Sequence, residues 1–294
     1  MPEGPEVRRV ADWLHQQLVG KYLVDIGWSE QSCYTNTRKY PAKEPNRYSE
    51  VNHLFPALFT DVHSHGKIII FTLQSEDQEF FLTNHLNMEG KWSVLPHKKH
   101  SDLWLILAEE MESVGDQRCF LEDSLYFTDT RKFGYLALHP SRAQLMEELD
   151  KKIGPDLLEA AINGFSLIDE WCTAAQRRKR STVADFLHNQ HNIAGIGNYL
   201  RAEIMYEACV DPRRKMGDLT DEELILLHDR SLAIIKASYE SHGLTISSYK
   251  DPAGFTGTYE VKVYSRSFDN LGNPVERYKK SGGQTVHWCP AVQK

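Results

Sequence analysis

The pattern of apolar residues changes once along the chain, near Ser141, and this change limits what the chain can fold into. Before Ser141 the apolar segments are short, rich in β-branched and aromatic residues, and separated by Gly, Asn, Asp and Pro. They cover residues 22–28, 59–73, 80–92, 103–107, 119–127 and 135–138. Such spacing is typical of an antiparallel β sandwich or barrel. We therefore expect a β domain over residues 1–140, preceded by a helix at its start.

After Ser141 the pattern is helical. A hydroxyl residue stands three positions before an acid or amide, the capping-box spacing, at Ser141/Gln144, Ser166/Asp169, Thr182/Asp185 and Thr220/Glu223. The last pair opens an apolar helix that Gly243 is expected to close. From Tyr259 the residues are again β-type, with a turn at 270–273. The fold class is therefore α+β, with a helical domain over 141–258 and a terminal hairpin over 259–294.

Bulk properties exclude several classes of protein. The 294 residues suit about two domains, and 41% hydrophobic content supports real cores. The sequence has neither a run of about 18 apolar residues nor a signal peptide. We expect a monomer with no membrane partner, located in the cytoplasm or nucleoid, or in a nucleus. The cysteines form no C-x-x-C pair and are expected to be reduced thiols: Cys33, Cys119, Cys172, Cys209 and Cys289.

The charge is unevenly distributed. A net charge of −7 argues weakly against a nucleic-acid partner, and acids cluster between Glu109 and Asp123. The tail from Val261, however, has six Lys/Arg against two Asp/Glu. A polarised surface could bind DNA on one side. The basic run 177–180 fits a solvated helix end or a targeting signal as well as a DNA contact.

Pro2 is a candidate nucleophile. If Met1 is removed, the proline nitrogen becomes a free secondary amine beside the Glu3 carboxylate, and an α-amino group is partly unprotonated near neutral pH. Addition to an aldehyde-like carbon would give an iminium, which is an electron sink for elimination. The alternative is a helix start: Gly4, Pro5 and Glu6 suit the cap and first turn, and apolar residues follow at helical spacing at Val7, Val10, Ala11, Leu14 and Leu18.

Two other segments are candidates for phosphate binding. Gly195 and Gly197 lie between predicted helices, where exposed N–H groups and Asn198 could donate to a phosphate; most such turns only connect helices. Lys67 is expected at a strand end, where a cation could hold a phosphate or remain an ordinary surface lysine. His63 and His65 alternate onto one face, but no third metal ligand accompanies them.

Two loops end in glycine after a bulky or cationic side chain. They are 85–90, with Met88, and 129–134, with Arg131 and Phe133. Loops of this kind can present a wedge that fills the space left by a base that leaves the stack. Composition alone favours the alternative that Met88 and Phe133 are core residues.

With these segments in view, the chain resembles the formamidopyrimidine-DNA glycosylase/endonuclease VIII (Fpg/Nei) family of base-excision repair enzymes. Matching segments run in family order across nearly the whole chain. They are 2–7, 65–67, 85–90, 129–134, 153–156, 194–198 with Ala202 and Glu203, and 263–266. The resemblance implies a β sandwich, a helix–two-turn–helix domain and a terminal finger.

The resemblance also implies roles for residues. Pro2 would attack C1′ of a damaged nucleotide, expel the base and leave an iminium-linked sugar for β- and δ-elimination, with Glu3 as acid/base and Lys67 on a phosphate. Glu6 would border the base pocket. Met88, Arg131 and Phe133 would fill the void, whereas His100, Lys132 and Asn198 would hold the DNA backbone. The implied partner is damaged double-stranded DNA, with single-stranded DNA left open, and no cofactor is implied.

The terminal finger departs from the family. Most members close with a four-cysteine zinc site, but only Cys289 is present here, and His287 with Cys289 cannot hold a structural zinc. We expect a zincless hairpin and no metal. Gln284 occupies the position of a family arginine that contacts DNA phosphate, so weaker binding or less complete δ-elimination is expected. Arg277 could substitute if the hairpin register differs.

Two interpretations of function follow. The first is a bifunctional DNA glycosylase and abasic-site lyase that removes oxidised bases. The segment 243–259 resembles the family's loop near the base pocket and is compact, which implies pyrimidines and ring-opened purines ahead of 8-oxoguanine. The alternative is a damaged-DNA-binding protein of the same fold with little or no turnover, which Gln284 and the acidic balance favour. Pro2, Glu3 and Lys67 argue more strongly for the enzyme.

Overall fold

The computed structural model describes residues 2–29, 45–76, 78–97, 100–114, 117–245, 254, 256–280 and 283–294. The chain packs into two compact units, and the residues of the expected finger fall in the same unit as most of the expected helical domain. One contains Pro2 and Val7–Leu149; the other contains Glu3–Glu6, 150–245 and Thr256–Lys294. The terminal hairpin does not stand alone because its Val286 is part of the hydrophobic core of the helices. Met1, Cys33 and Asp251-Pro252 lie outside the described residues.

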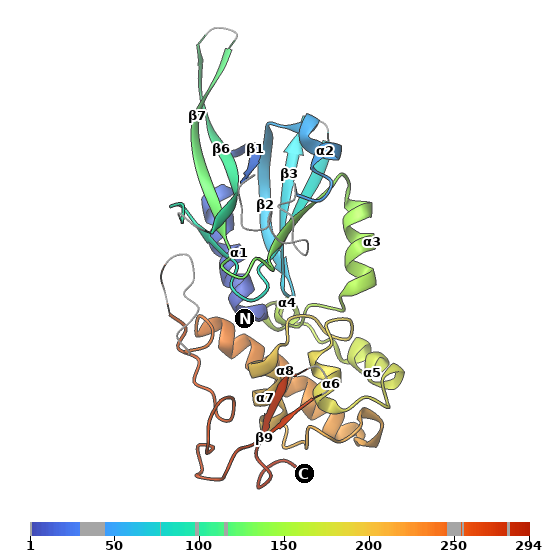
Figure 1. The fold of residues 1–294 in the computed structure, drawn as a ribbon. Coiled ribbons are helices and arrows are strands. Elements are labelled where there is room, and N and C mark those ends of the chain that lie inside the picture. Colours follow the sequence, from blue (N-terminus) through green and yellow to red (C-terminus); the bar gives the residue numbers. More distant parts are fainter. Residues whose placement is uncertain are drawn as a thin grey trace. The chain divides into compact units, whose positions relative to one another are not determined.

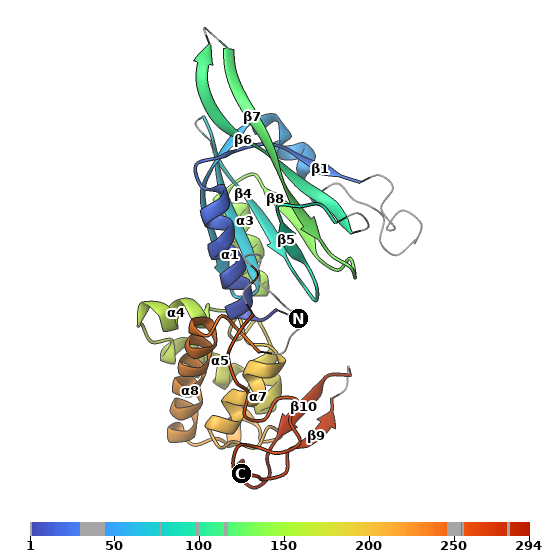
Figure 2. The ribbon, with the colours of Figure 1, turned by 90° about the vertical axis from the view of Figure 1, so that its left-hand side faces the viewer.

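The first unit is built on eight antiparallel strands in the order β5-β7-β6-β1-β2-β3-β4-β8 (Figures 1 and 2). Only two residue pairs, Tyr22–Leu58 and Leu23–Ala57, join β1 to β2. At this short ladder the sheet divides into the two layers of the expected sandwich. The strands are β1 (Tyr22–Trp28), β2 (Ala57–His65), β3 (Ile68–Ser75), β4 (Gln78–His85), β5 (Lys91–Ser93), β6 (Ser101–Val114), β7 (Gln117–Thr128) and β8 (Tyr135–His139).

Helix α1 (Gly4–Leu18) supplies the expected apolar stripe to this core. Its residues Val7, Val10, Ala11, Leu14 and Leu18 are at most 1% exposed and pack in one cluster with strand residues such as Phe59 and Phe71. Near the sheet lie α2 (Tyr48–Val51), a 3₁₀ turn at Asn52–Leu54 and α3 (Arg142–Lys152). The helix-start interpretation of Gly4–Glu6 is thus confirmed, and it leaves Pro2 two residues ahead of the helix.

Strands β6 and β7 are longer than the sequence predicted. Their ladder runs from Ser101–Thr128 to Val114–Gln117, and the hairpin extends beyond the other strands of the sheet (Figure 2). Residues 108–114 are rich in acids and lack apolar alternation. The expected strands 103–107 and 119–127 were therefore too short, because burial patterns mark only the part of a strand that covers a core.

The second unit gathers five helices and a hairpin around the buried Trp171, Phe186 and Leu227. Thr220 and Glu223 form the expected complete capping box, Thr182 accepts from the Asp185 N–H, and Ser141 accepts from the Gln144 N–H. The expected cap at Ser166 was wrong. The helix α5 (Ile168–Arg177) starts after Leu167, whose side chain is buried, and Ser166 accepts from Ile168 N.

The elements of the second unit are α4 (Leu157–Asn163), α5 (Ile168–Arg177), α6 (Val183–His188), α7 (Asn198–Glu207), a 3₁₀ turn at Met216–Asp218, α8 (Asp221–Glu240), β9 (Glu276–Lys279) and β10 (Thr285–Trp288). Among the helices the structure describes, none is long and apolar enough to cross a membrane.

The terminal finger is only partly a hairpin. The ladder of β9 and β10 is short, and residues 261–275 contain one isolated antiparallel bridge, Phe268 with Pro274, so the regular pairing covers less of the chain than the hairpin expected from Val261. Buried carboxylates also hold the backbone of this segment. Glu203 of α7 accepts from the N–H groups of Lys262, Val263 and Tyr264 at 2.7, 3.0 and 2.8 Å.

Asp269 organises the turn of this irregular segment. Its carboxylate accepts from the backbone of Leu271 and Asn273 and from Tyr206 Oη at 3.1 Å, and it lies 3.5 Å from Cys289 Sγ. Burial lowers the pKa of His287 to about 4, so this imidazole is neutral. Cys172, Cys209 and Cys289 are free thiols. Within the described ranges, no three His, Cys, Asp or Glu side chains form a metal-binding group.

Asp269→Asn is expected to destabilise the finger in a pH-dependent way. Burial alone would raise the pKa of Asp269, but the hydrogen bonds from Asn273, Leu271 and Tyr206 outweigh it and lower the pKa to about 2. Its stabilising contribution is therefore present above the ordinary pKa of 3.8 and is lost as pH falls through about 2. Removing the charge should cost about 1–3 kcal/mol near neutral pH. Urea unfolding between neutral and acid pH measures this, with the exposed Glu276→Gln as control; equal effects of the two changes would contradict the assignment.

Candidate catalytic residues and nucleic-acid interface

The Glu3 carboxylate is fixed at the start of α7, within the second unit. Its Oε2 accepts from Gly197 N at 2.7 Å and from Leu200 N at 3.3 Å, and its Oε1 accepts from Tyr199 N at 2.9 Å. The side chain is 2% exposed. Free N–H groups and the helix dipole at a helix N-terminus stabilise a negative charge. Glu3 is thus held as a positioned carboxylate directly after Pro2.

This arrangement corrects the expectation for the Gly195–Asn198 turn. Three N–H groups of the turn and first helical residues bind Glu3 rather than standing ready for a phosphate. Glycine is required because a Cβ on Gly197 would lie 2.2 Å from Glu3 Cδ. Nearby, Gly4 N donates to Gly195 O at 2.8 Å, with Gly195 at φ +101°. The glycines allow the chain start to lie against the turn.

Glu6 belongs to a buried hydrogen-bond network. Oε2 accepts from Glu3 N at 2.9 Å, and Oε1 accepts from Tyr199 Oη at 2.9 Å and from Leu244 N at 3.1 Å. Burial raises the pKa of Glu6 and raises that of Tyr199 well above its usual value. Because both Glu6 oxygens have protein donors, this side chain holds the Glu3 backbone in place. Its predicted position at a base pocket remains a proposal.

Asn198 is half-buried at the first position of α7. Its Oδ1 accepts from Arg201 Nη2 at 3.1 Å, so the donor Nδ2 is turned away from that guanidinium. Arg201 is 1% exposed and also reaches the carbonyl oxygen of Thr285 in β10. The i, i+3 spacing of Arg201 from Asn198 is the one signal of this contact in the sequence, and it does not by itself predict a buried arginine.

Pro2 and Lys67 both belong to the first unit. Pro2 is buried in the chain that still carries Met1. Lys67 is half-buried in the two-residue turn between β2 and β3, where Gly66 has φ +57° and His65 pairs with Ile68. The predicted strand-end position of Lys67 is therefore confirmed.

The two glycine-ended loops meet in the first unit. Arg131 Nε contacts Glu89 Oε1 at 2.9 Å, Arg131 Nη1 lies 3.3 Å from Met88 Sδ, and Asn87 donates to the Phe133 carbonyl. Met88 is 39% exposed and Phe133 is 42% exposed, so the core interpretation of these two residues was wrong. The hydrogen bond from Thr130, with the charge of Arg131, lowers the pKa of Glu89. The loops thus form one exposed tip carrying two apolar side chains and a cation.

Buried groups beneath the tip fix its shape. Asp129, 3% exposed, accepts from Arg131 N at 2.9 Å and from Gly134 N at 2.6 Å. A Cβ on Gly90 would lie 2.8 Å from Phe127 Cζ, and one on Gly134 would lie 2.6 Å from it. Both glycines are therefore required where the loops cross this ring.

The two predicted backbone-binding residues of the first unit flank the same tip. Lys132 has a left-handed conformation at φ +59° and is half-buried between Arg131 and Phe133. The His100 carbonyl oxygen accepts from Asp129 N at 3.2 Å, and the His100 ring stacks on His97 with centroids 4.9 Å apart. The structure therefore brings His100, Arg131, Lys132 and Phe133 to adjoining segments.

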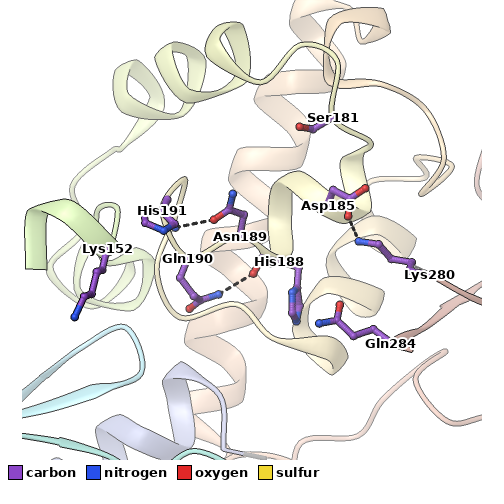
Figure 3. Close-up of a pocket in the computed structure, with 9 residues that line it drawn as sticks. All are labelled: Lys152, Ser181, Asp185, His188, Asn189, Gln190, His191, Lys280 and Gln284. Atoms are coloured by element: carbon purple, nitrogen blue, oxygen red, sulfur yellow. Dashed lines mark hydrogen bonds and ion pairs between the residues drawn. The ribbon is translucent and has the colours of Figure 1, made fainter. Parts of the chain in front are cut away.

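A polar pocket of about 550 Å³ lies in the second unit between α6, the loop after it and the end of the hairpin (Figure 3). Gln284 lines it, together with His188, His191, Lys152, Asp185 and Lys280. Arg277 does not: it pairs with His287 at the other end of β9 and donates to the Arg266 carbonyl. The hairpin therefore does not have the register in which Arg277 could take the place of the family arginine that Gln284 replaces. Lys280 and Asp185 are pocket residues that we did not single out from the sequence.

Comparison with known proteins adds the family context. The family model for the formamidopyrimidine-DNA glycosylase N-terminal domain matches residues 1–136, and that for the formamidopyrimidine-DNA glycosylase H2TH domain matches residues 153–250. The formamidopyrimidine-DNA glycosylases of Exiguobacterium sp. and Streptococcus mutans are 26% and 28% identical to this chain, over the full length of both partners.

Solved structures agree along the whole chain. A complex between the Lactococcus lactis Fpg and DNA containing an abasic site has a TM-score of 0.76 at 25% identity and covers 99% of each chain. An inhibited LlFpg with DNA containing N7-benzyl-Fapy-dG also has a TM-score of 0.76 at 25% identity, with complete coverage of both chains.

Proposed function

The chain belongs to the formamidopyrimidine-DNA glycosylase family, and from this premise we propose that it excises oxidised bases from double-stranded DNA and then cleaves the strand at the abasic site. The observation that carries the proposal is the fixed Glu3 carboxylate beside Pro2, held by three N–H groups of α7. An amine next to a positioned acid/base group is what nucleophilic displacement at a sugar carbon requires.

The first step uses Pro2 after removal of Met1. The lone pair of the secondary amine forms a bond to C1′ of the damaged nucleotide, and the bond from C1′ to the base breaks, so that the base leaves with that electron pair and takes up a proton. Opening of the sugar ring then gives a positively charged iminium between Pro2 and C1′. Loss of a C2′ proton to this electron sink expels the 3′ phosphate, which is β-elimination.

Glu3 and Lys67 support these steps. Glu3 is the group that exchanges a proton with the sugar ring, because its carboxylate is buried and cannot drift from its position. Lys67, on the turn between β2 and β3, provides a cation for a DNA phosphate and assists proton transfer. Glu6 and Tyr199 act behind Glu3 as positioning residues.

The reaction also requires that the damaged base leave the duplex, and the residues of the exposed tip would support this step. A base inside a duplex is out of reach, so it must leave the stack at a cost of a few kcal/mol, least for damaged pairs. Met88 and Phe133 would fill the void, and Arg131 would face the orphaned base, because all three are exposed on two loops that contact each other. His100, Lys132 and Asn198 would hold the backbone.

We place ring-opened purines and oxidised pyrimidines ahead of 8-oxoguanine among the substrates. The names of the relatives and the Fapy-dG analogue in a related complex support the first class. The lower rank of 8-oxoguanine rests on the compact segment 243–259, most of which lies outside the described residues. We further propose a monomer that works wherever the genome is kept, in a nucleoid, cytoplasm or nucleus.

Gln284→Arg is expected to strengthen DNA binding several-fold and to increase the share of δ-elimination product. Gln284 lines the open pocket and can donate a hydrogen bond, whereas arginine would add a charge and a bidentate donor. Gel-shift titration and product analysis on an abasic duplex measure both effects. No gain in affinity and no gain in δ-product would contradict this role for position 284.

A cleavage panel tests the proposed function. Thymine glycol, ring-opened guanine, 8-oxoguanine and an abasic site are placed in otherwise identical single and double strands. We expect cleavage of duplexes that carry the first two lesions and the abasic site. Binding of every lesion without cleavage would favour the alternative, a damaged-DNA-binding protein of the same fold.

A further inference from the structure

The pocket between α6 and the hairpin holds a cation that the sequence pattern did not reveal. Lys280 and Gln284 face each other across the hairpin turn: Lys280 N donates to Gln284 O at 2.9 Å, and Gly283 N donates to Lys280 O at 3.0 Å. Both side chains line the pocket (Figure 3). The neighbouring Lys279, in contrast, is exposed and is absent from the lining.

Lys280 is held by a specific acid. Its Nζ forms an ion pair with Asp185 Oδ1 on α6, while Asp185 Oδ2 accepts from Thr182 Oγ1 at 2.6 Å. The Lys280 side chain is 15% exposed, and its partial burial lowers the pKa of the ammonium, so the charge needs an anion beside it. Among the described residues that line the pocket, Asp185 is the only acid, whereas Lys152 and Lys280 are both cationic.

We propose that Lys280 supplies the phosphate-binding charge that Gln284 lacks. Asp185 holds the Lys280 ammonium in the pocket until a DNA phosphate takes the place of the Asp185 carboxylate. The inference rests on the proposed function, because it takes the pocket as part of the DNA-binding surface. Asp185 is 48% exposed, and an ion pair to such an exposed acid contributes little free energy. A DNA phosphate, with several acceptor oxygens, can therefore displace it.

The test measures binding rather than turnover, on a duplex with a stable abasic analogue, at salt concentrations from roughly 50 to 200 mM. Lys280→Ala should lower affinity about tenfold at low salt and reduce the slope of log K against log salt by about 0.9, the loss of one phosphate contact. Lys279→Ala removes the same charge one residue away and is the matched control. Lys280→Arg should restore the slope.

Asp185→Asn tests the second half of the proposal. The amide still accepts from Thr182 but neither neutralises Lys280 nor repels a phosphate, so this variant should bind the duplex a few-fold more tightly than the wild type. The gain in affinity should disappear in the double variant that combines Asp185→Asn with Lys280→Ala. Thermal unfolding of each variant shows whether the finger remains folded.

The outcomes separate the inference from the proposed function. Equal salt slopes for Lys280→Ala and Lys279→Ala would overturn the role of Lys280, and unchanged or weaker binding by Asp185→Asn would overturn the role of Asp185. Either result can occur in a protein whose wild-type form binds and cleaves damaged DNA normally. A wild type that neither binds nor cleaves any damaged duplex would instead refute the proposed function.

Discussion

Glu3→Gln is expected to lower the rate of base excision by about two to four orders of magnitude, the usual contribution of a positioned acid/base group. Glutamine has nearly the same shape but cannot take up a proton at the sugar ring. Its amide nitrogen would also face one of the N–H groups that now donate to the carboxylate, from Gly197, Leu200 or Tyr199. The measurement is single-turnover excision on a lesion-bearing duplex.

A preformed abasic site separates chemistry from folding in the Glu3→Gln protein. No base has to be expelled there, so the loss of strand cleavage should be smaller than the loss of excision. Binding of the abasic analogue and thermal unfolding provide the controls for local distortion. Equal excision by wild type and Glu3→Gln, in a folded protein, would contradict the role assigned to this carboxylate.

A chain that keeps a residue before Pro2 is expected to show no detectable excision or strand cleavage. The nitrogen of Pro2 is then part of a peptide bond and has no lone pair available for attack. The matched comparison uses one protein with a removable N-terminal extension, assayed before and after the extension is cleaved to expose Pro2. Binding to the abasic analogue should change far less than activity, because the tip residues Met88, Arg131 and Phe133 are untouched.

Motifs tied to local geometry were predictable from the sequence. Gly90 and Gly134 indicated the two loops, and Lys67 follows a Gly that makes a tight turn. The capping box of Thr220 and Glu223 predicts the start of a helix from four consecutive residues. Such signals are read locally, because the backbone conformation itself requires those residue types.

Features that depend on distant partners were not predictable. The N–H groups after Gly195 were assigned to a phosphate, but Glu3, 194 residues away from Gly197, takes them. Lys279 and Lys280 are adjacent lysines in the sequence, and only the folded hairpin places Lys280 beside Asp185. Exposure of Met88 and Phe133 likewise could not be read from their apolar character, because a functional wedge and a core residue have the same composition.

The most direct test of the account is reductive trapping of the covalent intermediate. Borohydride is added while the protein acts on a duplex with an abasic site or thymine glycol, and the adduct is digested and mapped by mass spectrometry. With Pro2 exposed, we expect one covalent adduct on the Pro2 nitrogen, absent when the N-terminal extension is retained. An adduct that forms equally with the blocked N-terminus, or that maps to a lysine, would contradict it.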